Sequence, residues 1–183
     1  PMDKYLPSKE VQNLVERGNV EVIFYSPAFH TMMKEIELTN TKIKYFICME
    51  EIADLDINRE KFLSMHKLIQ KGKSLIESGD KSFIDSEIDL KKMSILLFTS
   101  GTTSISKGVM LSHSNVSSNV TSIETEIKIE SDDVYLSLLP LHHTFENTVG
   151  FLFMISRGAC IAYCDGIKHI AQNIKEYKVT LLV

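Results

Sequence analysis

The sequence predicts an α/β fold, with a mostly parallel β-sheet that carries helices on both faces. Short apolar segments typical of strands alternate along the chain with longer segments in which apolar residues recur at helical spacing. The composition, 44% hydrophobic and 24% charged residues, is that of a globular protein. Because helices separate the strands, most connections are expected to be crossovers, which join parallel strands and place helices on the faces of the sheet.

The composition of short runs and the spacing of apolar residues in longer segments define the expected strands and helices. Short runs rich in apolar, β-branched or aromatic residues have the length and composition of strands. We expect these strands at residues 20–25, 44–49, 93–98, 134–138, 159–163 and 179–183. Longer segments carry apolar residues at every third or fourth position, as helices with a buried face do. We expect these helices at residues 8–17, 27–38, 59–77, 114–128, 145–156 and 167–177.

Turn-forming and capping residues delimit several elements. Ser8 is expected to cap the first helix, and Pro27 fits the first turn of the second. The Ser78-Gly79-Asp80 sequence is expected to end the third helix. Asp132-Asp133 is typical of a turn between a helix and a strand, so we do not expect these two residues to act as a catalytic carboxylate pair.

Composition and charge narrow the class of protein. The net charge of −4 and the lack of a basic stripe with interleaved aromatic residues disfavour nucleic-acid binding. No apolar run is long enough to span a bilayer, so we expect no transmembrane segment. The three cysteines are expected to be buried, reduced thiols, as in a cytoplasmic protein. Phe151, Phe153 and Met154 are expected to belong to the core.

Both ends of the chain predict that it is a piece of a larger protein. Residues 179–183 read as a buried strand with no turn after them, and position 1 is Pro1. An excised sheet would expose apolar strand ends, and these favour self-association of the piece.

Residues 98–108, FTSGTTSISKG, have the composition of a phosphate-binding loop. Hydroxyl groups, two glycines and one lysine follow an apolar strand, at the strand end where open α/β sheets bind ligands. Hydroxyls and backbone N–H groups donate to phosphate oxygens, glycine permits close approach of a ligand, and Lys107 adds positive charge. Carboxylates are absent from the loop. The hydroxyl donors are Ser100, Thr102, Thr103, Ser104 and Ser106.

The loop does not match the P-loop of nucleoside triphosphatases. Ser106 stands where that pattern requires glycine, and Gly108 follows the lysine where it requires serine or threonine. A flexible surface loop is the alternative that composition alone would favour.

The segment FTSGTTSISKGVMLSH resembles the signature of the adenylate-forming superfamily, [YF]-[TS]-S-G-T-T-G-x-P-K-G-V followed by S-H. That superfamily includes acyl-CoA synthetases, aryl-CoA ligases, luciferases and peptide-synthetase adenylation domains. Ser104 replaces its usual glycine and Ser106 its usual proline. We expect these changes to loosen the loop and to keep its phosphate-facing groups. His113, in the S-H part, is expected to cap or pack at the start of the following helix.

A second segment, LPLHHTFE at 139–146, resembles the superfamily pattern L-P-x-x-H-x-x-[GE]. The resemblance implies that His143 lines the acyl and adenylate site and that Phe145 borders the substrate pocket. His142 is expected to be a loop histidine. No carboxylate or third histidine lies at ligand spacing from this pair, so no metal site is expected.

The opening PMDKYLPSKE resembles bacterial long-chain fatty acyl-CoA synthetases, and the resemblance extends over nearly the whole chain. It implies that residues 1–183 are an incomplete slice of the amino-terminal AMP-binding domain of an acyl-CoA synthetase-like fold. The remainder of that domain and the carboxyl-terminal domain, with the adenine, ribose and catalytic-lysine motifs, are not found in the sequence. We therefore expect the isolated chain to be inactive.

The resemblance also implies an activity for the parent enzyme, a fatty acid–CoA ligase of lipid metabolism. A fatty carboxylate attacks the α-phosphate of ATP, with Mg²⁺, and coenzyme A then displaces AMP. Lys107 and His143 are the expected catalytic residues. The residues expected to bind the phosphates are Thr99, Ser100, Gly101, Thr102, Thr103 and Lys107.

Two alternatives remain open from the sequence. The first is a ligase of the same superfamily that uses acyl carrier protein as acceptor, or an aryl or amino acid as substrate. The second is a non-catalytic nucleotide-binding module, supported by the departures at Ser104 and Ser106.

Overall fold

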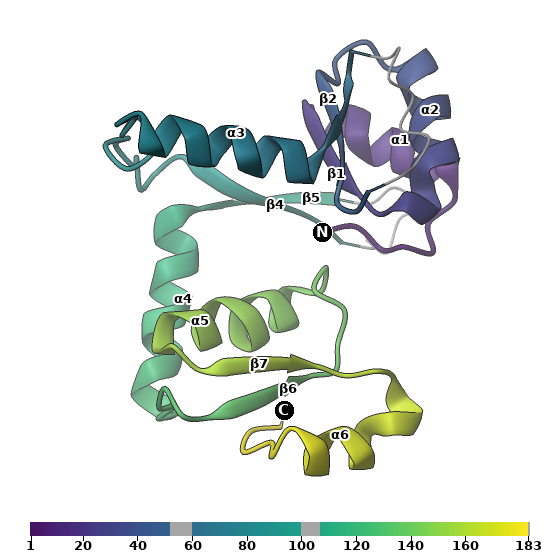
Figure 1. The fold of residues 1–183 in the computed structure, drawn as a ribbon. Coiled ribbons are helices and arrows are strands. Elements are labelled where there is room, and N and C mark those ends of the chain that lie inside the picture. Colours follow the sequence, from purple (N-terminus) through teal and green to yellow (C-terminus); the bar gives the residue numbers. More distant parts are fainter. Residues whose placement is uncertain (52–59, 100–106, 183) are drawn as a thin grey trace. The chain divides into compact units, whose positions relative to one another are not determined.

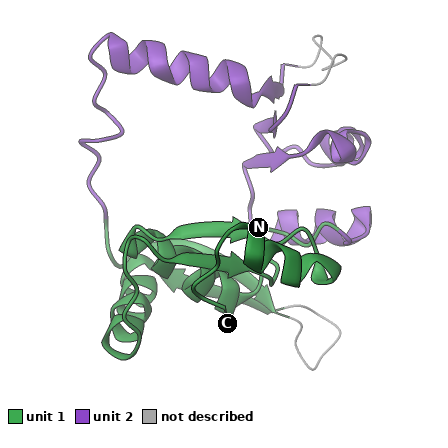
Figure 2. Cartoon of the chain, turned by 60° about the horizontal axis from the view of Figure 1, so that its bottom comes forward, with its two compact units in different colours: residues 1–4, 89–183 green, residues 5–88 purple. Residues whose placement is uncertain are grey.

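The computed structural model describes residues 1–51, 60–99 and 107–182. The chain divides into two compact units (Figure 2): unit 2 comprises residues 5–88, and unit 1 comprises residues 1–4 and 89–183. Within the described ranges, parallel strand pairs alternate with helices in both units, which confirms the predicted α/β class. None of the described helices has both the length and the apolar character needed to cross a bilayer.

Unit 2 contains a three-stranded parallel sheet in the order β1-β2-β3. Helices α1 and α2 contribute apolar side chains to the core that this sheet forms, and Phe46 of β2 stacks on Phe62 of β3 with ring centroids 4.8 Å apart. The strands are β1 (Val22–Tyr25), β2 (Tyr45–Cys48) and β3 (Phe62–Ser64). The helices are α1 (Ser8–Arg17), the short 3₁₀ turn η1 (Pro27–Phe29), α2 (His30–Thr39) and α3 (Met65–Glu77).

Two predictions for unit 2 are wrong in detail. The helix expected at 59–77 begins only at Met65, because Phe62–Ser64 pairs with β2 as a parallel strand and buries Phe62. Apolar spacing across this boundary fits both a strand end and a helix, so periodicity alone does not separate them. Ser8 is the first residue of α1, and Pro7 occupies the cap position without a side-chain hydrogen bond.

Unit 1 combines an antiparallel hairpin with a parallel β–α–β segment. Strands β4 (Met93–Thr99) and β5 (Lys107–Ser112) are antiparallel, and helix α4 (His113–Glu126) follows directly. Strands β6 (Val134–Ser137) and β7 (Cys160–Tyr163) are parallel. The connection between them holds the π-helix η2 (Glu146–Phe153) and α5 (Met154–Arg157). The 3₁₀ turn η3 (Ile167–His169) and α6 (Ile170–Glu176) follow β7.

The core of unit 1 lies between β6 and the helix formed by η2 and α5. Phe153 and Met154 are fully buried there with Tyr135, as expected for the first two, while Phe151 is half-buried. Figure 1 shows η2 and α5 on one side of the β6–β7 pair and α6 on the other. The strand expected at 179–183 is reduced in the described residues to one parallel bridge between Tyr135 and Leu181.

The largest correction concerns the segment after the signature loop. The sequence predicted no strand between the loop and the helix expected at 114–128, whereas Lys107–Ser112 forms β5 and pairs with β4. The apolar residues Val109, Met110 and Leu111 were too few to indicate a strand, and their pairing with β4 depends on a partner distant in sequence. The loop is therefore the connection of a hairpin, and α4 begins only after the second strand.

Candidate functional site

The two ends of the signature loop lie beside each other across the β4–β5 hairpin. Thr99 and Lys107 are direct cross-strand partners, and both are exposed. Cross-strand partners have Cβ atoms about 4.5–5.5 Å apart. A residue with a neutral hydroxyl and a residue with an ammonium group thus face each other at the loop end of the hairpin, which is a suitable arrangement for contacting an anion.

The remaining predicted phosphate-binding residues lie outside the described part of the chain. These are Ser100, Gly101, Thr102 and Thr103. The prediction for Thr99 and Lys107 can therefore be placed on the hairpin, while that for the other four stays a prediction from sequence.

Close packing across the hairpin fixes the position of Lys107. Gly108, next to it, pairs with Phe98. A Cβ atom at Gly108 would lie 3.3 Å from Leu96 Cδ1 and 3.4 Å from Phe98 Cε1, so the two side chains of β4 lie directly against this glycine. Leu97 between them is buried. The glycine of the Lys107-Gly108 pair thus allows close contact between the strands, in addition to any role toward a ligand.

The start of α4 has a complete capping box. The Ser112 hydroxyl accepts a hydrogen bond from the Asn115 backbone N–H at 3.2 Å, and the Ser112 backbone N–H donates to Asn115 Oδ1 at 3.0 Å. His113 is the first residue of α4 and is exposed, so Ser112 performs the capping that was expected of His113. The His113 backbone N–H donates to the carbonyl oxygen of Lys92 at 3.3 Å, which ties the helix start to the beginning of β4.

The second predicted segment is the connection between β6 and η2. His143 and Phe145 are exposed on it, and the ring of His142 lies 4.7 Å from that of His143. The His143 backbone N–H donates to Pro140 O at 2.9 Å, and the Asn147 N–H donates to His143 O at 2.9 Å. His143 is therefore held by its backbone, and its ring remains accessible to a ligand.

The sequence analysis assigned no role to the last residue of this segment, a buried carboxylate. Glu146 is fully buried, and its two oxygens accept hydrogen bonds from Tyr135 Oη at 2.9 Å and from the Ser137 hydroxyl. Burial, together with the bond to Glu146, raises the pKa of the Tyr135 phenol above its ordinary value. An acidic residue at the start of an otherwise apolar segment was the available signal in the sequence.

Two separate groups of predicted residues thus emerge in unit 1. Thr99 and Lys107 are paired on the β4–β5 hairpin, and His143 and Phe145 share the β6–η2 connection. No cluster of three or more His, Cys, Asp or Glu side chains suited to a metal ion occurs among residues 1–51, 60–99 and 107–182.

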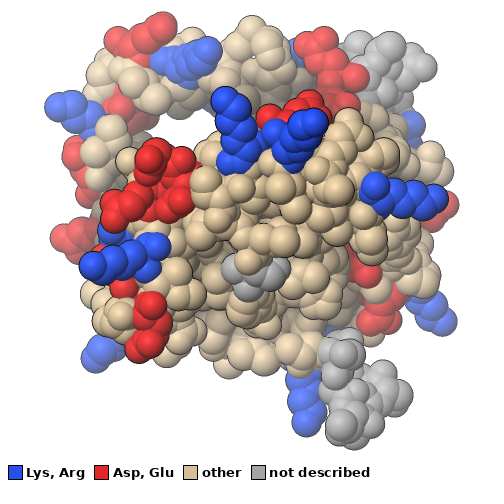
Figure 3. Space-filling model, turned by 90° about the horizontal axis from the view of Figure 1, so that it is seen from below, with Lys and Arg blue, Asp and Glu red and all other residues tan. Residues whose placement is uncertain are grey.

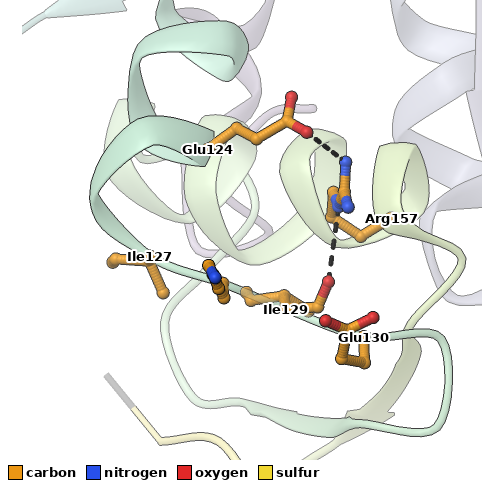
Figure 4. A pocket seen from close by; sticks show the side chains of 6 residues that line it. Glu124, Ile127, Ile129, Glu130 and Arg157 are labelled. Atoms are coloured by element: carbon orange, nitrogen blue, oxygen red, sulfur yellow. Dashed lines mark hydrogen bonds and ion pairs between the residues drawn. The ribbon is translucent and has the colours of Figure 1, made fainter.

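A shallow pocket elsewhere in unit 1 contains none of the predicted site residues. Its volume is about 240 Å³, and the Arg157 guanidinium occupies one side of it (Figure 4). Arg157 donates to Glu124 at 2.5 Å and to the Ile129 carbonyl oxygen at 3.3 Å, so its charge joins α5 to α4 and to the segment after α4. On the face shown in Figure 3, acidic and basic residues are interspersed, unlike the basic surface of a nucleic-acid-binding protein.

Curated proteins similar to this chain include two fatty acyl-CoA synthetases. "Long-chain-fatty-acid–CoA ligase 5" of Mus musculus is 34% identical over 99% of this chain and 27% of its own length. "Fatty acyl-CoA synthetase B" of Dictyostelium discoideum is 29% identical over 93% of this chain and 25% of its own length. The chain therefore spans about a quarter of the length of these relatives.

Solved structures show the same fold. The anthranilate CoA ligase AuaEII in complex with anthranoyl-AMP superposes with a TM-score of 0.77 at 18% identity, over 99% of this chain and 34% of that one. The family model described as "AMP-binding enzyme" matches residues 1–183, the full extent of the sequence. With that match and the 34% identity to the mouse ligase, this chain belongs to the family of AMP-binding enzymes.

Proposed function

We propose that this chain is a segment of the amino-terminal AMP-binding domain of an ATP-dependent fatty acyl-CoA synthetase. The longer protein would activate a fatty acid, most suitably a long-chain one, and transfer it to coenzyme A. The names of the two fatty acyl-CoA synthetase relatives support this substrate class, and the quarter of their length that the chain spans supports the assignment as a segment.

The placement of Lys107 carries the proposal. Lys107 lies on an exposed strand end directly across from Thr99, and residues 100–106 connect the two residues along the chain. A single cation beside neutral donors suits the β- and γ-phosphates of ATP, because it attracts the anion and the sequence of residues 98–108 contains no carboxylate to repel it. We assign Thr99 and Lys107 to these phosphates, together with Ser100, Gly101, Thr102 and Thr103 of the connecting loop.

The proposed first step forms an acyl-adenylate. A carboxylate oxygen of the fatty acid attacks the α-phosphorus of ATP, and the bond from that phosphorus to the bridging oxygen breaks. Pyrophosphate leaves with the bonding electrons, so negative charge grows on it in the transition state. Lys107 stabilises this growing charge, and a donor that is already in place at that moment contributes most to the rate.

The proposed second step forms the thioester. The sulfur of coenzyme A attacks the acyl carbon, its proton is released, and AMP leaves. We assign His143 and Phe145 to the pocket that holds the acyl group and its adenylate, because both are exposed on one short connection whose backbone is hydrogen-bonded at His143.

The described residues offer no carboxylate cluster for the Mg²⁺ that accompanies ATP. We assign none of these described residues to the metal. The role of this chain's own residues is to bind the phosphates and to position the acyl group.

The direct test uses the full-length protein, ATP and a panel of acids. We expect pyrophosphate release to depend on a long-chain fatty acid and a thioester to form with coenzyme A. Faster turnover with an aryl acid, or transfer to acyl carrier protein instead of coenzyme A, would replace the proposed substrate or acceptor. ATP binding without pyrophosphate release for any acid would identify a non-catalytic module and overturn the proposal.

A further inference from the structure

The connection that carries His143 and Phe145 is closed at its base by one pair of side chains. Ser137 is the last residue of β6 and Glu146 is the first residue of η2, and the Ser137 hydroxyl donates to Glu146 Oε1. All of residues 138–145, including the two predicted site residues, lie between these two ends.

A second hydrogen bond fixes the same carboxylate to the core. Tyr135 Oη donates to Glu146 Oε2 at 2.9 Å, and Tyr135 itself is fully buried in the core of unit 1. Tyr135 and Ser137 are alternate residues of β6, so their side chains leave the strand on the same face. Both oxygens of Glu146 are thus bonded to one rigid strand, which fixes the orientation of the first turn of η2.

The absence of a side chain at Gly150 makes room for this arrangement. A Cβ atom there would lie 2.6 Å from Glu146 Oε1 and 2.8 Å from Tyr135 Oη, so a side chain at this position would require the carboxylate or the phenol to shift. The helix at this point also has the wider π geometry, which often occurs at functional sites. Leaving a buried carboxylate without its donors is unfavourable, so the bonded geometry is strongly preferred.

From these contacts we infer that Glu146 is a positioning residue for the acyl pocket. Its carboxylate fixes residues 138–145 against β6 and thereby sets the direction in which His143 and Phe145 point. This inference rests on the proposed function, because it takes those two residues to border the substrate.

Two conservative substitutions at Glu146 distinguish a positioning role, which depends on the length of the side chain, from a role of its negative charge. Glu146→Gln keeps the length of the side chain, and its amide can still bond to both hydroxyls, because each hydroxyl can donate or accept. Glu146→Asp keeps the charge but shortens the side chain, so it cannot reach both donors. Gly150→Ala displaces the carboxylate without altering Glu146. The matched control is Glu130→Asp, since Glu130 is exposed and donates a hydrogen bond to Asp133 through its backbone N–H.

The kinetic measurement compares the KM values for the fatty acid and for ATP in the full-length protein. We expect Glu146→Asp and Gly150→Ala to raise the KM for the acid about tenfold and to leave the KM for ATP within about twofold, as misplaced pocket residues would. Glu146→Gln and the control should resemble the wild type. Equal loss in both KM values, or a Gln variant as impaired as the Asp variant, would overturn the inference.

A second readout does not depend on catalysis. Hydrogen exchange at the backbone amides of His143 and Asn147, both bonded at 2.9 Å, reports whether this segment is held. We expect exchange at these amides to be faster in Glu146→Asp than in the wild type or in Glu146→Gln. Unchanged exchange would overturn the positioning role. A wild-type protein that releases no pyrophosphate would instead overturn the proposed function, so the two failures can be told apart.

Discussion

His142 and His143 are adjacent in sequence but differ in exposure. His143 is exposed and His142 is half-buried, and their rings lie 4.7 Å apart. The resemblance to the superfamily pattern assigns only His143 to the substrate. The exposure of its ring is compatible with that assignment.

Alanine substitutions at the two histidines test this assignment. In the full-length protein, we expect His143→Ala to lower kcat/KM for acyl-CoA formation about tenfold or more, because it removes a group that orients the acyl moiety. His142→Ala should stay within about twofold, since it removes only a neighbouring ring. A larger loss at position 142 would show that the alignment with the pattern is displaced by one residue.

The sequence identified some buried residues and not others, because these residues are buried for different physical reasons. Phe153 and Met154 were correctly placed in the core, because an apolar side chain is buried by its own chemistry. Glu146 could not be placed in this way. Its burial depends on donors from β6 and on the gap at Gly150, and neither is visible as a local pattern.

Local signals predicted the helices better than the short strands. Helix α4 was expected from residue 114 and begins at His113, where the capping box of Ser112 and Asn115 forms. Strand β3 was missed because it has only three residues, and β5 because only three of its six residues are apolar. Each is stabilised by pairing with another strand. Such pairing is a tertiary interaction, which sequence periodicity does not report.

The capping box predicts a measurable contribution to stability. Ser112→Ala removes the acceptor for the Asn115 N–H and should lower the free energy of unfolding by about 1 kcal/mol. Urea unfolding of the chain, followed by circular dichroism, measures this change. Ser118→Ala, at an exposed position within α4, is the control and should be neutral or slightly stabilising. Equal destabilisation by both changes would contradict a specific role of the cap.

Asp133, in the turn before β6, is expected to make the stability of the fold depend on pH. The Thr180 hydroxyl donates to Asp133 Oδ1 at 2.6 Å, and the Glu130 N–H donates to Asp133 Oδ2 at 2.9 Å. These bonds lower the pKa of the Asp133 carboxyl below its ordinary value. Because the pKa is lower in the folded chain, the ionised form stabilises the fold above the unfolded-state pKa. That contribution is lost on the acid side of about pH 4, as the pH falls through the folded-state pKa.

Thr180→Val tests the hydrogen bond that joins the segment after α6 to the turn before β6. The substitution removes the hydroxyl and should raise the pKa of Asp133 toward its ordinary value, which NMR titration of the carboxyl carbon detects. The exposed Asp132 serves as the internal control in the same spectrum. An unchanged Asp133 titration would show that the Thr180 hydrogen bond does not form in solution.

At the scale of the whole molecule, fold and family were predictable while substrate was not. The alternation of strands and helices indicated an α/β fold, and the signature loop indicated the AMP-binding family that the comparisons confirm. The substrate depends on a complete pocket, and this chain corresponds to about a quarter of its relatives' length. The phosphate-binding prediction for residues 100–103 also lies outside the described residues.

Because the chain spans only about a quarter of its relatives' length, we predict that it does not catalyse the reaction in isolation. We expect the purified 183-residue chain to form no acyl-CoA from ATP, a fatty acid and coenzyme A, because adenylation requires groups that hold the adenosine and the acid together with the phosphates. The full-length protein in the same assay is the positive control. Thioester formation by the short chain alone would refute this expectation.

The central claim is that the loop end of the β4–β5 hairpin, at Thr99 and Lys107, binds the phosphates of ATP. Fatty-acid-dependent exchange of pyrophosphate into ATP, measured in the full-length protein with Lys107→Ala, tests it most directly. Lys92→Ala, which removes an exposed lysine beside the opposite end of the same hairpin, is the matched control. We predict that Lys107→Ala slows exchange about a hundredfold and that Lys92→Ala leaves it unchanged. Equal exchange rates in the two variants would contradict the claim.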